Sequence, residues 1–210
     1  VSFVRLMRPQ QWIKNGFVWV GLVFGHVLTE PTYLLRAGWA TLAFMLISSA
    51  VYALNDTLDA ARDRQHPSKA LRPIASGQIA ASQALWFALT LALLALWIAY
   101  QASAMVCALI GMYALLNIAY SIGLKRVPVL DIFIIAAGFM LRLLAGTAGI
   151  GIDPSHWLLL CGFLLTLFLG FAKRRAELAQ LAEGSQAHRP VLAAYSIGFL
   201  DAAVHFSAGS

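Results

Sequence analysis

The chain has 210 residues, of which 60% are hydrophobic and 11% charged, whereas roughly a quarter of the residues in soluble domains are charged. This composition argues against a water-soluble fold, and Cys107 and Cys161 suggest neither a disulfide framework nor a metal site because both fall in apolar runs. The formal net charge of +6 favours anionic lipids or ligands, although membrane topology alone accounts for most of it.

Apolar runs long enough to cross about 30 Å of hydrocarbon recur along the chain. The first run is too long for a signal peptide, and no small-residue cleavage site follows it. We therefore expect an all-α transmembrane bundle that forms a single domain over 1–210. The expected spans are 12–29, 37–55, 81–100, 102–120, 129–151 and 155–172, with a seventh from about Pro190.

The positively charged residues predict the orientation of these spans, because short cytoplasmic loops carry an excess of Lys and Arg. Only Arg36 falls in a loop on the opposite side, and Arg142 lies inside a span. We therefore expect a multi-pass protein of the plasma (inner) membrane with a cytoplasmic N-terminus. The residues on the shared side are Arg5, Arg8, Lys14, Arg62, Arg64, Lys69, Arg72, Lys125, Arg126, Lys173, Arg174, Arg175 and Arg189.

The loop between the second and third expected spans is the most polar stretch. If the preceding helix continues beyond the membrane, Asn55, Asp56, Asp59 and Asp63 recur at steps of one, three and four residues and share a face. Carboxylates so close repel one another, and oxygen ligands suit Mg²⁺, which takes one or two carboxylates together with substrate phosphates. This pattern predicts a metal site at the three aspartates and a diphosphate substrate. The alternative is a solvated loop in which these residues pair with neighbouring arginines.

Cationic side chains accompany the acidic ones. Lys69 and Arg72 follow them in the same loop, where they can hold phosphate oxygens or face lipid headgroups. Lys14 and Asn15 open the first span and can reach a phosphate, although this signal is weak alone. Lys173 and its neighbours after the sixth span form a further basic patch.

Polar residues also enter the fourth and fifth spans. Tyr120 belongs to a stripe that leads into Lys125 and Arg126, and such a stripe faces either a wet cavity or another helix. Asp131 begins the fifth span, and Arg142 lies three turns deeper, about 16 Å away along a helix. The two are therefore too far apart to pair, and we favour a structural role for Arg142 over a catalytic one.

The pattern NDxxDxxxD at 55–63 resembles the first aspartate-rich motif of the UbiA-type intramembrane prenyltransferases. The segments 8–15, 66–77, 120–126 and 131–142 look like one branch of that superfamily, the decaprenyl-phosphate phosphoribosyltransferases. The resemblance extends to about residue 200. It implies a bundle of nine spans around a central cavity and Mg²⁺-dependent transfer of 5-phosphoribose from 5-phosphoribosyl 1-diphosphate to a polyprenyl phosphate such as decaprenyl phosphate, with release of diphosphate.

The resemblance also implies roles for individual residues, which fall into two groups. Asp56 and Asp59, with Asn55 and Asp63, would hold Mg²⁺ and the leaving diphosphate. The candidates for binding the substrates are Lys14, Asn15, Lys69, Arg72, Tyr120, Lys125, Arg126, Asp131, Arg142, Lys173 and Arg174.

Two departures from the family pattern matter. Where aromatic prenyltransferases carry a second acidic motif, this chain has the basic stretch 173–177. We therefore expect one metal cluster and a second anionic substrate, with Lys173 and Arg174 beside it. The second departure is length, because nine implied spans exceed those present, and we expect the domain to be incomplete at its C-terminus.

Two alternative functions stay open. The same acidic cluster suits an aromatic prenyltransferase that uses an isoprenyl diphosphate, and a comparison of labelled donors separates the two reactions. A transporter or lipid-binding bundle would instead line a permeation path with the polar stripes, and flux across liposomes without covalent change would reveal it. Nothing indicates nucleic-acid binding, and the oligomeric state, a homo-oligomer included, stays open.

Overall fold

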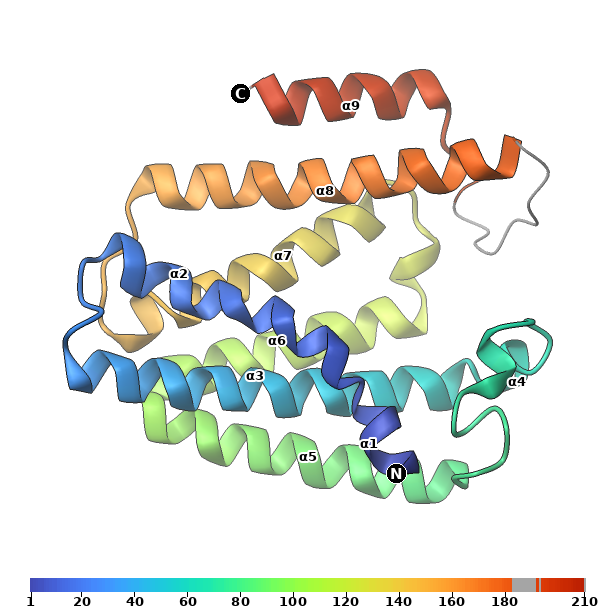
Figure 1. Cartoon of the computed structure of the whole chain (residues 1–210), viewed down its shortest axis with the longest axis horizontal. Coiled ribbons are helices and arrows are strands. Elements are labelled where there is room, and N and C mark those ends of the chain that lie inside the picture. The colour runs from blue at the N-terminus through green and yellow to red at the C-terminus, as the bar shows by residue number, and fades with distance from the viewer. Residues whose placement is uncertain (183–191, 193, 210) are drawn as a thin grey trace. The chain divides into compact units, whose positions relative to one another are not determined.

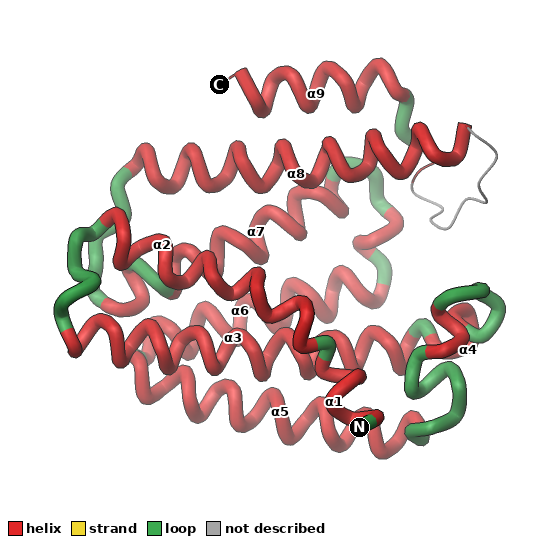
Figure 2. The backbone as a smooth tube through the Cα atoms, in the orientation of Figure 1, coloured by secondary structure: helices red, strands yellow, loops and turns green. Residues whose placement is uncertain are grey.

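A computed structural model describes residues 1–182, 192 and 194–209, and all regular secondary structure in this part of the chain is helical (Figures 1 and 2). The prediction of an all-α fold is confirmed. The helices are α1 (Ser2–Met7), η1 (Pro9–Gly16), α2 (Phe17–Phe24), α3 (Pro31–Leu58), α4 (Ala60–Asp63), η2 (Lys69–Leu71), α5 (Ala81–Ala102), α6 (Ala104–Ile122), η3 (Leu124–Arg126), α7 (Leu130–Ala145), η4 (Ala148–Ile150), α8 (His156–Ala182) and α9 (Ile197–Gly209), where η marks a 3₁₀ helix.

Five helical segments of the described chain are long and apolar enough to cross a membrane. They coincide with the second to sixth expected spans, which are thereby confirmed. The chain is therefore a multi-pass membrane protein. The segments are Pro31–Leu58, Ala81–Ala102, Ala104–Ile122, Leu130–Ile150 and His156–Ala179.

The first expected span is not one continuous α-helix. Arg8 has a left-handed backbone conformation (φ 53°), Pro9 begins the 3₁₀ helix η1, and α2 ends at Phe24 before Gly25. Because a 3₁₀ helix rises about 2.0 Å per residue, η1 and α2 together still extend about 28 Å. At the other end of the chain, Arg189 and Pro190 lie outside the described residues, and α9 begins at Ile197.

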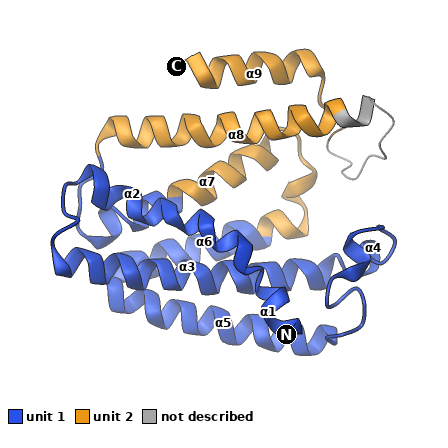
Figure 3. Ribbon diagram, in the orientation of Figure 1, with its two compact units in different colours: residues 1–118, 141–154 blue, residues 119–140, 155–210 orange. Residues whose placement is uncertain are grey.

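The chain divides into two compact units (Figure 3). Unit 1 comprises residues 1–118 and 141–154, and unit 2 comprises 119–140 and 155–210. The helices α6 and α7 each pass from one unit into the other. Buried apolar side chains form two clusters within unit 1 and a third within unit 2.

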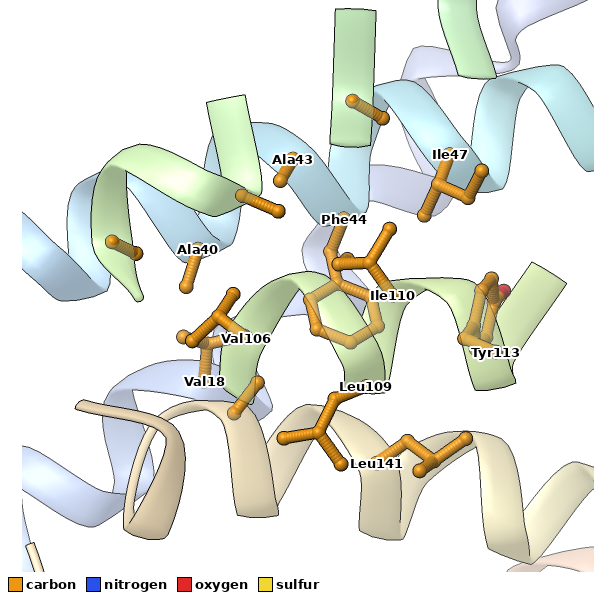
Figure 4. Close-up of a cluster of buried hydrophobic side chains, with 14 of the residues drawn as sticks. Val18, Ala40, Ala43, Phe44, Ile47, Val106, Leu109, Ile110, Tyr113 and Leu141 are labelled. Atoms are coloured by element: carbon orange, nitrogen blue, oxygen red, sulfur yellow. The ribbon is translucent and has the colours of Figure 1, made fainter. Parts of the chain in front are cut away.

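The larger core of unit 1 surrounds Phe44, near the middle of α3 (Figure 4). The Phe44 ring meets the Tyr113 ring of α6 edge to face, with centroids 5.4 Å apart. Ala37 and Ala40 on α3 are fully buried, and such small residues let neighbouring helices approach closely. The helix α3, which packs along α5, is therefore the central element of this unit.

Unit 2 is built on the packing of α8 against α9 and on the first turns of α7. Gly170 on α8 lies against Ile132, and the space for a Cβ at this glycine is taken by the Ile132 side chain. The buried core of this unit consists of Ile132, Ala136, Leu167, Phe171, Tyr195 and Leu200.

Candidate functional site

The acidic motif lies where α3 ends. Asp56 belongs to the last turn of α3 and Asp63 ends α4, and both are buried, whereas Asn55 and Asp59 are half-buried. Asp59 has a non-helical backbone (φ −92°, ψ 0°) between the two helices. The expected single helical face is therefore interrupted at Asp59, although Asp56 and Asp63 still approach the same point.

That point is occupied by the guanidinium group of Arg72. One nitrogen, Nη1, donates to Asp56 Oδ1 at 3.1 Å and to Asp63 Oδ2 at 2.7 Å. Arg8 Nη2 donates to the same oxygen of Asp56. Two buried carboxylates thus converge on one positive group, and a second positive group lies beside them.

The loop that carries Arg72 is anchored at both ends. His66 Nδ1 accepts the backbone N–H groups of Ser68 (3.2 Å) and Lys69 (3.4 Å), which stabilises the turn that begins η2. Further along, Ile74 and Ile79 are buried in a cluster with residues of α3 and α5. These contacts hold the backbone of the loop close to the end of α3.

The N-terminal segment is fixed to α3 on both sides of Arg8. Trp12 Nε1 donates to Ser49 Oγ at 3.1 Å. The Ser49 hydroxyl lies 2.7 Å from the Met45 carbonyl of its own helix and 3.1 Å from the Met7 carbonyl, and it shares its one proton between them. The Arg8 guanidinium lies over the Tyr52 ring, 5.1 Å from its centroid, a favourable cation–π distance. Arg8 is therefore held at the carboxylates by contacts along α3.

Arg8 is a residue that sequence reasoning missed as a site residue. Its charge served only to predict topology and its position served only as part of the family resemblance. The available signal was the segment 8–15, which resembles the opening of that branch and places this arginine ahead of Lys14. Nothing in the spacing links it to Asp56, 48 residues away.

A second polar cluster in unit 1 surrounds Arg142. Its Nε donates to Asn15 Oδ1 at 2.9 Å, its Nη2 donates to the Tyr113 hydroxyl at 2.9 Å, and it lies over the rings of Phe44 and Tyr113. The amide nitrogen of Asn15 is buried without a hydrogen-bond partner in the described part of the chain. Lys14, which precedes Asn15 in the sequence, is exposed. Of the two residues predicted to reach a phosphate, Asn15 is therefore buried beside Arg142, and only Lys14 lies at the surface.

In unit 2, Asp131 and Arg174 are buried against each other. Arg174 Nε and Nη2 both lie 2.9 Å from Asp131 Oδ2, and Arg174 Nη1 lies 2.9 Å from Glu177. The Tyr195 hydroxyl donates to Asp131 Oδ1 at 2.6 Å and accepts the Val129 N–H at 2.6 Å. Asp131 and Arg174 therefore form an internal ion pair that joins the beginning of α7 to α8.

The Tyr195 phenol is protonated over a wide pH range. Burial, and secondly the hydrogen bond to Asp131, raise the pKa of Tyr195 to about 12. Its partner Val129 has a positive φ of 67°, a strained conformation for a β-branched residue. The hydrogen bond from the Val129 N–H to the Tyr195 hydroxyl thus stabilises a backbone conformation that valine disfavours.

The other predicted residues of unit 2 are more accessible. Tyr120 near the end of α6 and Lys125 of η3 are half-buried, whereas Arg126 and Lys173 are exposed. These side chains stay candidates for contacts with anionic groups.

The acidic motif can be tested for its fit to Mg²⁺. Among the described residues, no group of three His, Cys, Asp or Glu side chains could hold a metal ion together, so the contribution of Asp59 stays a prediction. Asp56 and Asp63 do fit, because two carboxylates completed by substrate phosphates are a usual ligand set for this ion. Their convergence on the Arg72 nitrogen indicates that both reach one cation.

Comparisons with known proteins agree on the kind of protein. The model of the UbiA prenyltransferase family matches residues 16–208. The chain is 35% identical to a decaprenyl-phosphate phosphoribosyltransferase of Corynebacterium glutamicum over 84% of its own length and 54% of that protein. It is also 35% identical to the decaprenyl-phosphate phosphoribosyltransferase of Mycolicibacterium smegmatis, over 95% of its length and 64% of that protein. The chain thus spans less than two thirds of the length of these relatives.

The fold has a counterpart among solved structures. A UbiA homolog from Archaeoglobus fulgidus bound to DMAPP and Mg²⁺ superimposes with a TM-score of 0.82 at 18% sequence identity, covering 100% of this chain and 74% of that one. At this identity the likeness shows the fold alone.

Proposed function

Because the chain belongs to the UbiA prenyltransferase family, we propose that it transfers 5-phosphoribose from 5-phosphoribosyl 1-diphosphate to a polyprenyl phosphate and releases diphosphate. Its similarity to two bacterial decaprenyl-phosphate phosphoribosyltransferases supports this choice of substrates. We further propose that residues 1–210 belong to one transmembrane domain. The excess of Lys and Arg in alternate loops supports a cytoplasmic N-terminus and a site on the cytoplasmic face of the plasma membrane.

One observation carries the proposal: Asp56 and Asp63 converge with Arg8 and Arg72 at the end of a membrane-spanning helix. Two carboxylates with adjacent guanidinium groups can bind a metal–diphosphate group, since the acids suit a hard cation and the arginines suit phosphate oxygens. The position at the end of a membrane-spanning helix, together with the partly exposed side chains of Arg8 and Arg72 (22% and 27%), suits a water-soluble donor.

The reaction requires little of the protein beyond binding and orientation. The attacking oxygen of a phosphate monoester is already anionic at neutral pH, so no side chain has to remove a proton from it. Arg8 and Arg72 would hold the leaving diphosphate, while Asp56 and Asp63 would hold the Mg²⁺ ion that binds it. Mg²⁺, when bound there, supplies charge neutralisation of the leaving group.

Further basic residues are proposed as phosphate contacts. Lys69 follows the acidic motif in the same loop, and Lys14 is exposed at the first expected span. In unit 2, Lys125, Arg126 and Lys173 would bind phosphate groups of the substrates. Arg174 and Asp131, proposed from the sequence for the same task, hold each other and would shape the segment that carries Lys173.

Transfer of label into lipid tests the proposed reaction. Membranes that contain the protein are incubated with Mg²⁺, polyprenyl phosphate and a donor labelled in its ribose. We expect Mg²⁺-dependent label in the lipid fraction, whereas a parallel incubation with labelled isoprenyl diphosphate and an aromatic acceptor yields none. Label from the isoprenyl donor alone would overturn the proposal in favour of an aromatic prenyltransferase.

A further inference from the structure

Two arginines balance the charges of the buried Asp56–Asp63 pair. Asp56 and Asp63 carry two negative charges, and Arg8 and Arg72 carry two positive charges within hydrogen-bond distance of them. The exposed fractions of the Asp56 and Asp63 side chains are only 3% and 5%, so solvent screens these charges weakly. A divalent cation that arrived alone would therefore meet two acids that arginines already neutralise, with Arg72 at the point where the two acids converge.

The two arginines are held differently. Arg8 itself has a left-handed backbone conformation, and its guanidinium lies over the Tyr52 ring. The flanking residues Met7 and Trp12 both contact the Ser49 hydroxyl of α3. Arg72 extends from the loop after η2, and in the described part of the chain its side chain has no such flanking contacts, although its exposed fraction (27%) is close to that of Arg8 (22%). Its long stem lets the guanidinium turn away while the backbone stays anchored by Ile74. Arg8 is thus the fixed cation, and Arg72 is the one that can exchange.

We propose that Arg72 is the resting counter-cation of the Asp56–Asp63 pair, and that a divalent metal enters only together with diphosphate, whose oxygens then bind the Arg72 guanidinium. This inference rests on the proposed function, because it concerns the same diphosphate site. The diphosphate brings the additional negative charge that a divalent cation needs at this arginine-neutralised pair of acids. It also offers the Arg72 guanidinium a bidentate partner in exchange for the two carboxylates. Arg8 stays on Asp56 and contacts the diphosphate from the other side.

The exchange predicts a binding order that a plain carboxylate site would not show. A site with two uncompensated acids would attract a divalent cation in the absence of any phosphate. With Arg72 in place, metal and diphosphate must bind interdependently, each raising the affinity of the other by the same factor.

Binding of Mn²⁺, followed by its electron paramagnetic resonance signal in the purified full chain, tests this order without any turnover. Mn²⁺ accepts the same oxygen ligands as Mg²⁺, and inorganic diphosphate serves as the anionic probe. For the wild type we expect weak binding of Mn²⁺ alone and an affinity at least about tenfold higher with diphosphate. For Arg72→Gln we expect Mn²⁺ alone to bind about tenfold more tightly than to the wild type, with little further gain from diphosphate.

Two variants serve as controls. Arg64→Gln removes a positive charge from the same loop, where Arg64 Nε contacts the Ala75 carbonyl at 3.3 Å and no acid of the pair, and it should bind Mn²⁺ as the wild type does. Arg72→Lys keeps the positive charge and should bind Mn²⁺ alone as weakly as the wild type does. A difference between the Gln and Lys variants then reports the charge at this position and not a folding defect caused by loss of the arginine.

The possible results separate this inference from the proposed function. If wild type and Arg72→Gln bind Mn²⁺ alone equally tightly, the exchange is refuted while the metal–diphosphate site stands. If no variant binds Mn²⁺ even with diphosphate, both the exchange and the metal part of the proposed function are overturned.

Discussion

Buried acids at the end of α3 are tolerated because arginines neutralise them. Taking a carboxylate out of water is costly, and breaking a buried ion pair by removing one partner typically costs about 3–5 kcal/mol. Asp56 has two arginine partners and Asp63 has one of the same two. Arg8 and Arg72 are therefore needed for the fold of this corner as well as for the proposed binding of phosphate, and their loss should affect both.

Tyr195→Phe tests the role of one hydroxyl in unit 2. The variant keeps the ring but loses the bonds to Asp131 and Val129, so we expect a loss of roughly 2 kcal/mol of stability at neutral pH. The folded-state pKa of about 12 lies above the ordinary value of 10.0. The stabilisation by this phenol should therefore be complete below about pH 10 and disappear as the pH rises through about 12.

Thermal unfolding of the detergent-solubilised protein at several pH values measures this difference. Tyr100→Phe, on the exposed side of α5, is the matched control and should unfold like the wild type. A Tyr195→Phe variant as stable as the wild type at pH 8 would show that the hydroxyl contributes nothing.

The sequence predicts single residues well where spacing carries the information. The steps between Asp56, Asp59 and Asp63 identified the acidic motif, but they did not show that Asp59 lies at a break, because Leu58 and Ala60 beside it favour helix. Ion pairs between distant segments, such as Asp131 with Arg174, leave no periodic trace. A basic run at a membrane boundary looks the same in sequence whether its arginine is solvated or buried.

At the level of elements, five of the spans expected from apolar length are confirmed, because a helix must cover the hydrocarbon whatever its neighbours are. The first run, at 12–29, is also apolar, yet its helical part consists of the end of the 3₁₀ helix η1 up to Gly16 and the short helix α2, which ends before Gly25. Composition alone cannot reveal this, because its average is unchanged by breaks. The contacts of this region with α3, through Trp12 and Arg8, depend on that broken path.

Gly21→Ala tests the close approach of α2 to the end of α7. A Cβ at this position would collide with the Gly146 carbonyl oxygen and the Thr147 side chain, and backbone atoms cannot move aside cheaply. We expect a loss of about 1–3 kcal/mol, measured as a lower unfolding temperature in detergent. Gly111→Ala on α6, where a Cβ meets nothing within 4 Å, should be harmless; equal destabilisation by both variants would contradict this packing.

At the scale of the whole molecule, the membrane-spanning helices differ in how much of their apolar surface is enclosed by protein. In unit 1, 67% of the most apolar stretch of α3 is buried, against 28% of that of α5. The helix that leads into the acidic motif is therefore more enclosed by protein than α5. Exposed apolar residues such as Trp86 and Trp97 on α5 suit contact with lipid. The family and the membrane-embedded fold could be predicted from the sequence because the motif and the apolar runs are local features. The division into two units could not, since it depends on contacts between distant segments.

The central claim is that the Asp56–Asp63 pair holds the divalent cation that binds the leaving diphosphate, and the rate of phosphoribosyl transfer in Asp56→Asn tests it most directly. Glu30→Gln, an exposed acid at the opposite end of α3, is the matched control at equal amounts of folded protein. We predict that Asp56→Asn lowers the rate by at least about 100-fold while Glu30→Gln leaves it unchanged. Equal rates in the two variants would contradict the claim.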